Sequence, residues 1–79
     1  MSEFPREITF KAVFRSSDYL SESVRVLLAE HLEHFSLTEK PSGGGKFISY
    51  TISAVFDSED RLNILTNAVS SVEGFTLMV

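Results

Sequence analysis

The chain has 79 residues, a formal net charge of −4 and no cysteine. This length fits one small domain, and a domain of this size buries only about 60% of the surface that its unfolded chain exposes. The lack of cysteine excludes a disulfide framework, a thiolate metal site and a cysteine nucleophile. The acidic surplus argues against a nucleic-acid binder, because phosphate neutralisation supplies most of the affinity in that class.

The sequence carries no sign of export or membrane insertion. Residues 1–6, MSEFPR, contain no apolar signal core, and no apolar run approaches the roughly 20 residues of a membrane span. We expect a cytoplasmic protein with no membrane partner. We also expect a single domain over residues 1–79, with residues 1–6 as a short tail.

The first predicted elements are a strand and a helix. Glu7–Arg15 alternates apolar and polar residues, with Phe10 and Phe14 on the apolar side, which is typical of a strand with one buried face. Ser16–Phe35 changes to a three–four spacing, which predicts a helix with one apolar stripe. Ser17 or Asp18 is expected to cap this helix. The stripe contains Leu20, Val24, Leu27, Leu28, His31 and Phe35.

The second half of the chain again contains strand-like and helix-like patterns of apolar residues. Ser36–Lys40 is short and polar, and Pro41 cannot donate to a central ladder, so an edge strand is expected there. Lys46–Asp57 is the strongest strand, with Tyr50 among its inward residues. Asp57 or Ser58 should cap a second helix that Gly74 ends. The chain then closes with a strand, Phe75–Val79, whose expected inward residues are Phe75, Leu77 and Val79.

The element order is therefore βαββαβ. One apolar stripe per helix and one apolar face per strand predict a ferredoxin-like α+β sandwich, in which a four-stranded antiparallel sheet carries both helices on one face. The first and third strands should be central, and the short second strand should lie at an edge.

The stretch EKPSGGGKFISY, Glu39–Tyr50, has two interpretations. Three glycines before a lysine suggest a phosphate-binding loop, but that motif needs Ser or Thr after the lysine and a helix behind it. Phe47 follows Lys46 here, and the next element is a strand. The pattern favours a hairpin connection, and a weaker anion contact through Lys40, Lys46 and the glycine amides stays open.

Other candidate chemistry is sparse. EHLEH places Glu30, His31, Glu33 and His34 within about one and a half helical turns, but no ligand from a second element is identifiable. No serine has an identifiable base or oxyanion-hole motif beside it. Only Phe47 is aromatic on the predicted open face of the sheet, and the RNA-recognition signature is absent. We expect no enzyme, no metal and no cofactor, and we keep an RNA-binding module only as the weakest alternative function.

The open face offers the candidate sites. It is rich in hydroxyl groups and mildly basic, whereas the acidic residues concentrate on the helices. An ordinary solvated face explains this pattern, and so does a contact surface for a second copy of the chain or another partner. A small anionic metabolite should contact Lys11, Arg15 and Ser17. A protein partner should instead use the edge strand and hairpin through Lys40, Ser42, Lys46 and Phe47.

Two stretches resemble a known family. EFPREITFKA, with Glu3, Phe4 and Pro5 before the first strand, and KPSGGGKFISYTIS resemble the YbeD-like small bacterial proteins. The resemblance implies a ferredoxin-like fold similar to the small-molecule-sensing ACT regulatory domains, and it implies no established activity or functional residue. RSSDYL, residues 15–20, lacks the glycine often seen in the ACT ligand loop. The leading interpretation is a regulatory domain that binds an anionic metabolite, and the alternative is a protein adaptor.

Overall fold

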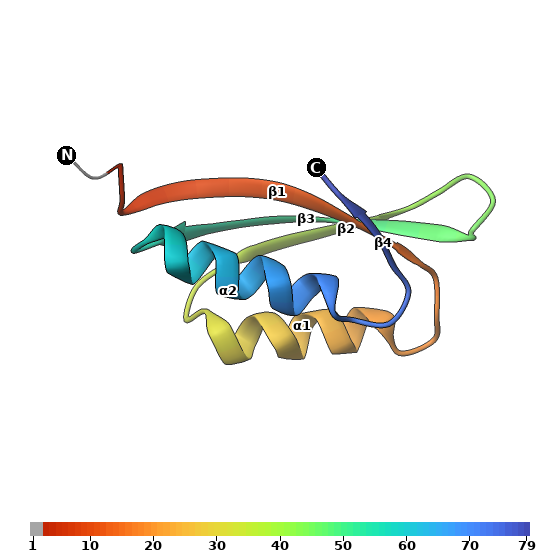
Figure 1. The fold of residues 1–79 in the computed structure, drawn as a ribbon. Coiled ribbons are helices and arrows are strands. Elements are labelled where there is room, and N and C mark those ends of the chain that lie inside the picture. The colour runs from red at the N-terminus through yellow and green to blue at the C-terminus, as the bar shows by residue number, and fades with distance from the viewer. Residues whose placement is uncertain (1–2) are drawn as a thin grey trace.

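The computed structural model contains four strands and two helices in the predicted order (Figure 1). It describes residues 3–79, so residues 1–2 of the predicted tail lie outside the described residues. Arg6, also assigned to that tail, already belongs to the first strand. The elements are β1 (Arg6–Arg15), α1 (Leu20–His31), β2 (Ser36–Pro41), β3 (Phe47–Phe56), α2 (Glu59–Ser70) and β4 (Phe75–Met78).

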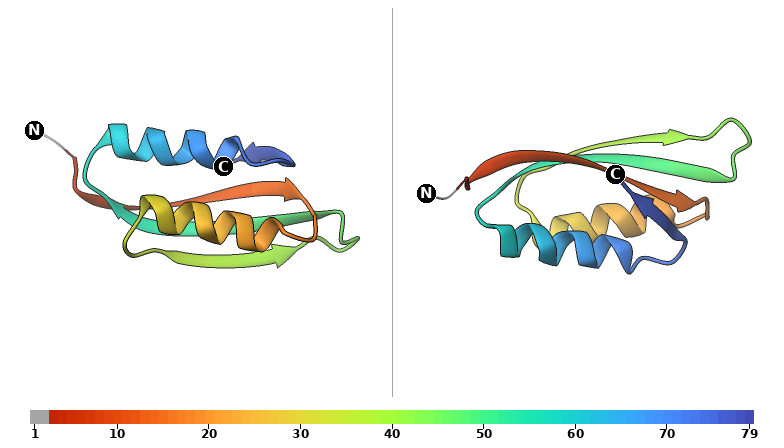
Figure 2. Two further views of the ribbon diagram at one scale, coloured as in Figure 1. Left: turned by 90° about the horizontal axis from the view of Figure 1, so that it is seen from below. Right: turned by 45° about the horizontal axis from the view of Figure 1, so that its top comes forward.

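The sheet is antiparallel and has the strand order β2-β3-β1-β4. The predicted central pair, β1 and β3, and the predicted edge position of β2 are therefore confirmed. Both helices lie on one face of the sheet, and the opposite face has no helix over it (Figures 1 and 2). This is the predicted ferredoxin-like α+β architecture.

The core forms between the helices and the inward side chains of the two long strands. The T-shaped contacts of Phe14 with Tyr50 and with Phe75, at centroid distances of 5.9 and 5.6 Å, join β1 to β3 and β4. Such edge-to-face pairs add to the stabilisation that comes from burial alone. The buried apolar residues are Phe10, Ala12, Phe14, Leu20, Val24, Leu28, Tyr50, Ile52, Ala54, Phe56, Leu65 and Val69.

The helix ends differ from the prediction in three places. α1 is shorter than Ser16–Phe35, and Tyr19 stands at its N-cap without a side-chain capping bond, so the predicted cap by Ser17 or Asp18 is wrong. Ser58 does cap α2, because its hydroxyl accepts a hydrogen bond from the Arg61 N–H at 3.2 Å. α2 ends at Ser70, and Gly74 instead adopts a positive φ of 91° in the connection to β4.

The prediction for the last strand is wrong for two residues because a register shift interrupts its pairing with β1. Leu77 lies opposite Val13, whereas Phe75 lies opposite Phe14, so one extra β4 residue is accommodated between them. Phe75 and Met78 therefore face the core. Leu77 lies on the open face instead, and the backbone of Val79 pairs with Lys11, which places it on that face too.

The glycine stretch is the β2–β3 hairpin connection, as predicted, and no helix follows it. Ser42 closes the loop: its N–H donates to the Phe47 carbonyl at 2.8 Å, and its hydroxyl accepts from the Phe47 N–H at 3.2 Å. Gly45 takes a positive φ of 71°, which glycine adopts readily. The hairpin projects beyond the ends of both helices (Figures 1 and 2).

Candidate functional site: a basic patch on the open face of the sheet

The register of the sheet fixes which side chains share the open face. Arg15 lies opposite Phe47, Val13 opposite Ser49, and Lys11 opposite Thr51. Because side chains alternate along a strand, all six point away from the core. The sequence predicted this face for Lys11, Arg15 and Phe47, and the structure confirms that assignment.

Residues predicted to contact a metabolite and residues predicted to contact a protein partner meet at the hairpin end of the open face. Lys40 lies opposite Ser49 and is therefore the diagonal neighbour of Phe47, while Leu77 completes the row beyond Val13. Phe47 is 37% exposed and Leu77 is 46% exposed. We call this set the basic patch: it consists of Lys11, Val13, Arg15, Lys40, Phe47 and Leu77.

The remaining predicted residues lie beside the patch. Ser17 is exposed in the β1–α1 loop, past the end of β1. This loop is tied to the hairpin because the Ser16 N–H donates to the Lys46 carbonyl at 2.9 Å. The Ser42 hydroxyl is engaged within the hairpin, so its clear contribution is to hold Phe47 in place.

The molecule is electrostatically two-sided. Eight of the eleven acidic residues lie in the helices or within three residues of their ends, where Arg25 and Arg61 are the only basic residues. Four of the seven basic residues lie on the open face or in the hairpin: Lys11, Arg15, Lys40 and Lys46. Among residues 3–79 the one ion pair within 4.0 Å joins Arg6 to Glu3. The cations of the basic patch therefore have no anionic partner among the described residues.

A buried polar group lies on the other side of the sheet. Burial raises the pKa of the Tyr50 phenol, and the Glu39 carboxylate adds to this rise, while the Ser21 hydroxyl and Arg25 act in the opposite direction. Although Ser21 is near, the Tyr50 hydroxyl has no partner at hydrogen-bond geometry among the described residues. Ser21 Oγ instead donates to Glu39 Oε1 at 3.3 Å.

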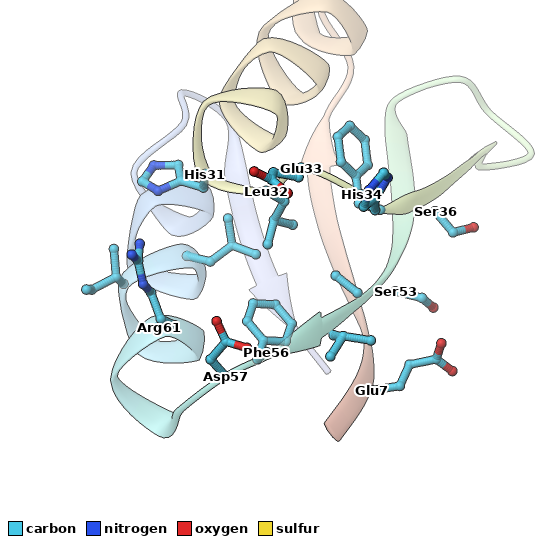
Figure 3. A pocket seen from close by; sticks show the side chains of 15 residues that line it. Glu7, His31, Leu32, Glu33, His34, Ser36, Ser53, Phe56, Asp57 and Arg61 are labelled. Carbon is cyan, nitrogen blue, oxygen red and sulfur yellow. The ribbon is translucent and has the colours of Figure 1, made fainter. Parts of the chain in front are cut away.

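A hollow of about 820 Å³, which was not predicted from the sequence, lies at the end of the molecule opposite the hairpin. We call it the end hollow; it lies between the chain that links α1 to β2, the start of α2 and the end of β3. Figure 3 shows His31 and Arg61 on one side of it and Ser36, Ser53 and Glu7 on the other. His31 is exposed at the end of α1 and does not continue the buried stripe.

The residues of EHLEH do not gather into a metal site. Within residues 3–79, no three His, Asp, Glu or Cys side chains are grouped so that they could hold a metal ion. Neither α1 nor α2 is long and apolar enough to cross a membrane.

The strand order and the placement of both helices on one face define the ferredoxin-like class of α+β domains. The chain belongs to the family described as "Protein of unknown function (DUF493)", which matches residues 1–79. Membership confirms the resemblance to the YbeD-like small bacterial proteins. It assigns no activity, ligand or partner to the fold.

Two relatives illustrate the sequence similarity. The UPF0250 protein of Shewanella amazonensis is 32% identical over 73 residues, which cover 91% of this chain and 83% of the relative. The UPF0250 protein IL0958 of Idiomarina loihiensis is also 32% identical, over 72 residues that cover 90% of this chain and 82% of the relative.

Two solved structures share the fold. The solution structure of protein HP0495 from H. pylori matches with a TM-score of 0.83 and 19% identity, over 100% of this chain and 86% of that one. The uncharacterized protein TM1266 from Thermotoga maritima matches with a TM-score of 0.74 and 14% identity, over 94% of both chains. At these identities the likeness concerns the fold alone.

Proposed function

We propose that the protein is a non-enzymatic binding module whose basic patch recognises an acidic surface of a partner protein. One observation carries the proposal: half-exposed apolar side chains, Phe47 and Leu77, lie among unpaired cations on a sheet face that no helix covers. An apolar centre with a polar rim is the usual anatomy of a protein–protein interface.

The charge distribution supports an acidic partner. The two-sided charge would orient an approaching acidic surface toward the open face and away from the helices, which speeds productive encounters. The projecting hairpin adds contact area next to Phe47 (Figure 1). Catalysis is not part of the proposal, because both histidines lie near the end of α1, at the other end of the molecule.

A small anionic metabolite is the other candidate for the same cations. Lys11 and Arg15 share the open face but have Val13 between them, and Ser17 lies beyond the strand. None of these three residues lines the end hollow or the smaller hollow beside Val26 and Leu27 of α1, whereas small ligands usually bind in concave sites. This geometry favours a broad partner surface, and metabolite binding by Lys11, Arg15 and Ser17 stays a prediction.

Site-specific photocrosslinking tests the proposal. A photoreactive phenylalanine analogue replaces Phe47 in one variant and Val26, on the exposed side of α1, in the control. In extracts of the cells of origin, we expect products from position 47 alone. The captured protein is then purified, and its Kd for the wild-type chain and for Lys11→Glu/Arg15→Glu is measured by calorimetry.

The expected result is at least about tenfold weaker binding by the double variant, because each reversal replaces an attraction by a repulsion. Arg25→Glu, on the helix side, is the matched control and should change the Kd little. Equal weakening by both variants, or none, would refute the assignment to the basic patch. Melting curves with pooled anionic metabolites form a second arm: stabilisation that Lys11→Glu/Arg15→Glu abolishes would favour the metabolite instead.

A further inference from the structure

The end hollow exists because β3 is longer than its edge neighbour. β1 accompanies β3 over the whole of its length, from Phe47 to Phe56, but β2 begins only opposite Ser53. Val55 therefore has Glu7 beside it on one side and no β2 residue on the other. The chain that links α1 to β2 passes around this gap and leaves it open.

The gap displays backbone hydrogen-bonding groups. In an antiparallel pair, every second residue turns both its N–H and its C=O toward the same neighbour. Phe47 turns its carbonyl toward β2, because that carbonyl accepts from the Ser42 N–H. Counting in steps of two along β3 from Phe47 reaches Val55, whose N–H and C=O thus face the gap. An added extended segment needs such a donor and acceptor.

The walls of the end hollow suit an apolar side chain. Phe56 and Leu65, both buried in the core, form its floor. Val55 and Ile64 flank the hollow with 60% and 51% of their surfaces exposed, so an occupant would remove apolar surface from water.

The rim selects the charge of the occupant. Arg61 and His31 lie on one side of the hollow (Figure 3), and Arg61 has no ion-pair partner within 4.0 Å among residues 3–79. Glu7, Glu33 and Asp57 also line the hollow. One carboxylate placed at Arg61 is favoured, whereas further negative charges along the ligand would meet these three acidic side chains.

From this combination we propose that the end hollow binds the carboxyl-terminal end of a partner polypeptide in an extended conformation. One residue of the peptide pairs with the backbone of Val55, its neighbour places an apolar side chain over Phe56 and Leu65, and the terminal carboxylate reaches the Arg61 guanidinium. The three acidic residues on the rim favour a peptide whose last side chains are apolar and uncharged, so that the terminal carboxylate is its one negative group. This site lies apart from the basic patch and does not depend on it.

Two peptides that differ in one group test the proposal by NMR titration of the ¹⁵N-labelled full chain. The first is acetyl-Ala-Val-Leu with a free carboxylate, and the second is the same peptide with a terminal carboxamide. We expect shifts at residues 31–36, 53–57 and 61–65, including a downfield shift of the Val55 amide proton. The free acid should bind about fivefold or more tightly, since a charge-assisted hydrogen bond is roughly twice as strong as a neutral one.

The Arg61→Gln variant separates the charge from the shape of the site. It should lower the affinity of the acid to that of the carboxamide and leave the carboxamide unchanged. Arg25→Gln is the matched control and should change neither affinity. Lys11→Glu/Arg15→Glu should also change neither, which keeps this test separate from that of the basic patch. Equal binding of the two peptides, shifts that fall elsewhere, or an unchanged spectrum at millimolar peptide would each overturn the proposal.

Discussion

Tyr50 combines complete burial with a hydroxyl that has no hydrogen-bond partner among the described residues. A buried polar group without a partner costs about 1–3 kcal/mol. Tyr50→Phe keeps the ring that packs on Phe14 and removes this cost. We therefore expect the free energy of unfolding to rise by about 1 kcal/mol, as measured by urea denaturation. Phe14→Leu is the control: it removes part of the same aromatic pair and should destabilise the fold.

The same phenol should make the stability of the protein depend on pH in the alkaline range. Its pKa is raised in the folded protein from the ordinary value of 10.0, so the folded state keeps the proton under conditions in which the unfolded state loses it. The contribution of Tyr50 to the free energy of unfolding is therefore constant below pH 10 and falls as the pH rises above that value. Denaturation between about pH 9 and 11 should show a smaller decline for Tyr50→Phe than for the wild type. Parallel declines would show that Tyr50 does not contribute.

Gly74 is a glycine whose replacement should be costly for two reasons. Its φ of 91° disfavours any L side chain, and a Cβ atom there would lie 3.2 Å from the Arg15 carbonyl oxygen. We expect Gly74→Ala to lower the free energy of unfolding by about 1–2 kcal/mol. Gly43→Ala, at a site with no atom within 4 Å, is the matched control and should change it little. Similar losses in thermal melts of both variants would contradict the strain at Gly74.

At the scale of the elements, the two helices begin differently. Only α2 has a side-chain cap, from Ser58, while α1 begins at Leu20 without one. Ser58→Ala should lower the free energy of unfolding by about 1 kcal/mol, because it removes the acceptor of the Arg61 N–H. Ser17→Ala, which the sequence would have predicted to be equally harmful, should have little effect. A larger loss for Ser17→Ala would restore the cap that the structure does not show.

The elements also show where sequence periodicity is informative. Alternation over ten residues in β1 and β3 fixed their inward and outward faces correctly, since a long strand averages over local irregularities. β4 has four residues, and a single register shift reversed the orientation of Leu77. The end of α1 was misplaced because Phe35 continues the helical spacing although the chain has already turned toward β2. Apolar spacing reports burial and does not by itself report backbone conformation.

At the scale of the whole molecule, the basic patch was partly predicted from the sequence and the end hollow was not. The alternation of side chains along a strand placed Lys11, Arg15 and Phe47 on one face. Recognising that Lys40 and Leu77 lie beside them required the strand order and the β4 register. The hollow arises from the unequal lengths of β2 and β3. The short polar run Ser36–Lys40 beside the long run Lys46–Asp57 was the signal that could have revealed it, because one end of the longer strand must lack a partner.

The crowding of acidic residues around the helices should make stability depend on salt. Like charges on one side of a compact molecule repel one another, and the Debye length falls from about 30 Å at 0.01 M salt to about 8 Å at 0.15 M. We expect the thermal midpoint to rise over this range. Glu22→Gln/Glu30→Gln, both on α1, should gain a few tenths of a kcal/mol at low salt and respond less to added salt.

Lys11→Gln/Arg15→Gln changes the same number of charges on the opposite side of the sheet and serves as the control. It makes the molecule more negative, so it should not raise the midpoint at low salt. Thermal melts of the three proteins at both salt concentrations distinguish the causes. If both variants gained stability equally, repulsion among the acidic residues around the helices would not be the source. If only the glutamate variant gains, the acidic side of the molecule lowers its stability. The charge asymmetry that we propose for orienting an acidic partner then has a cost on the helix side.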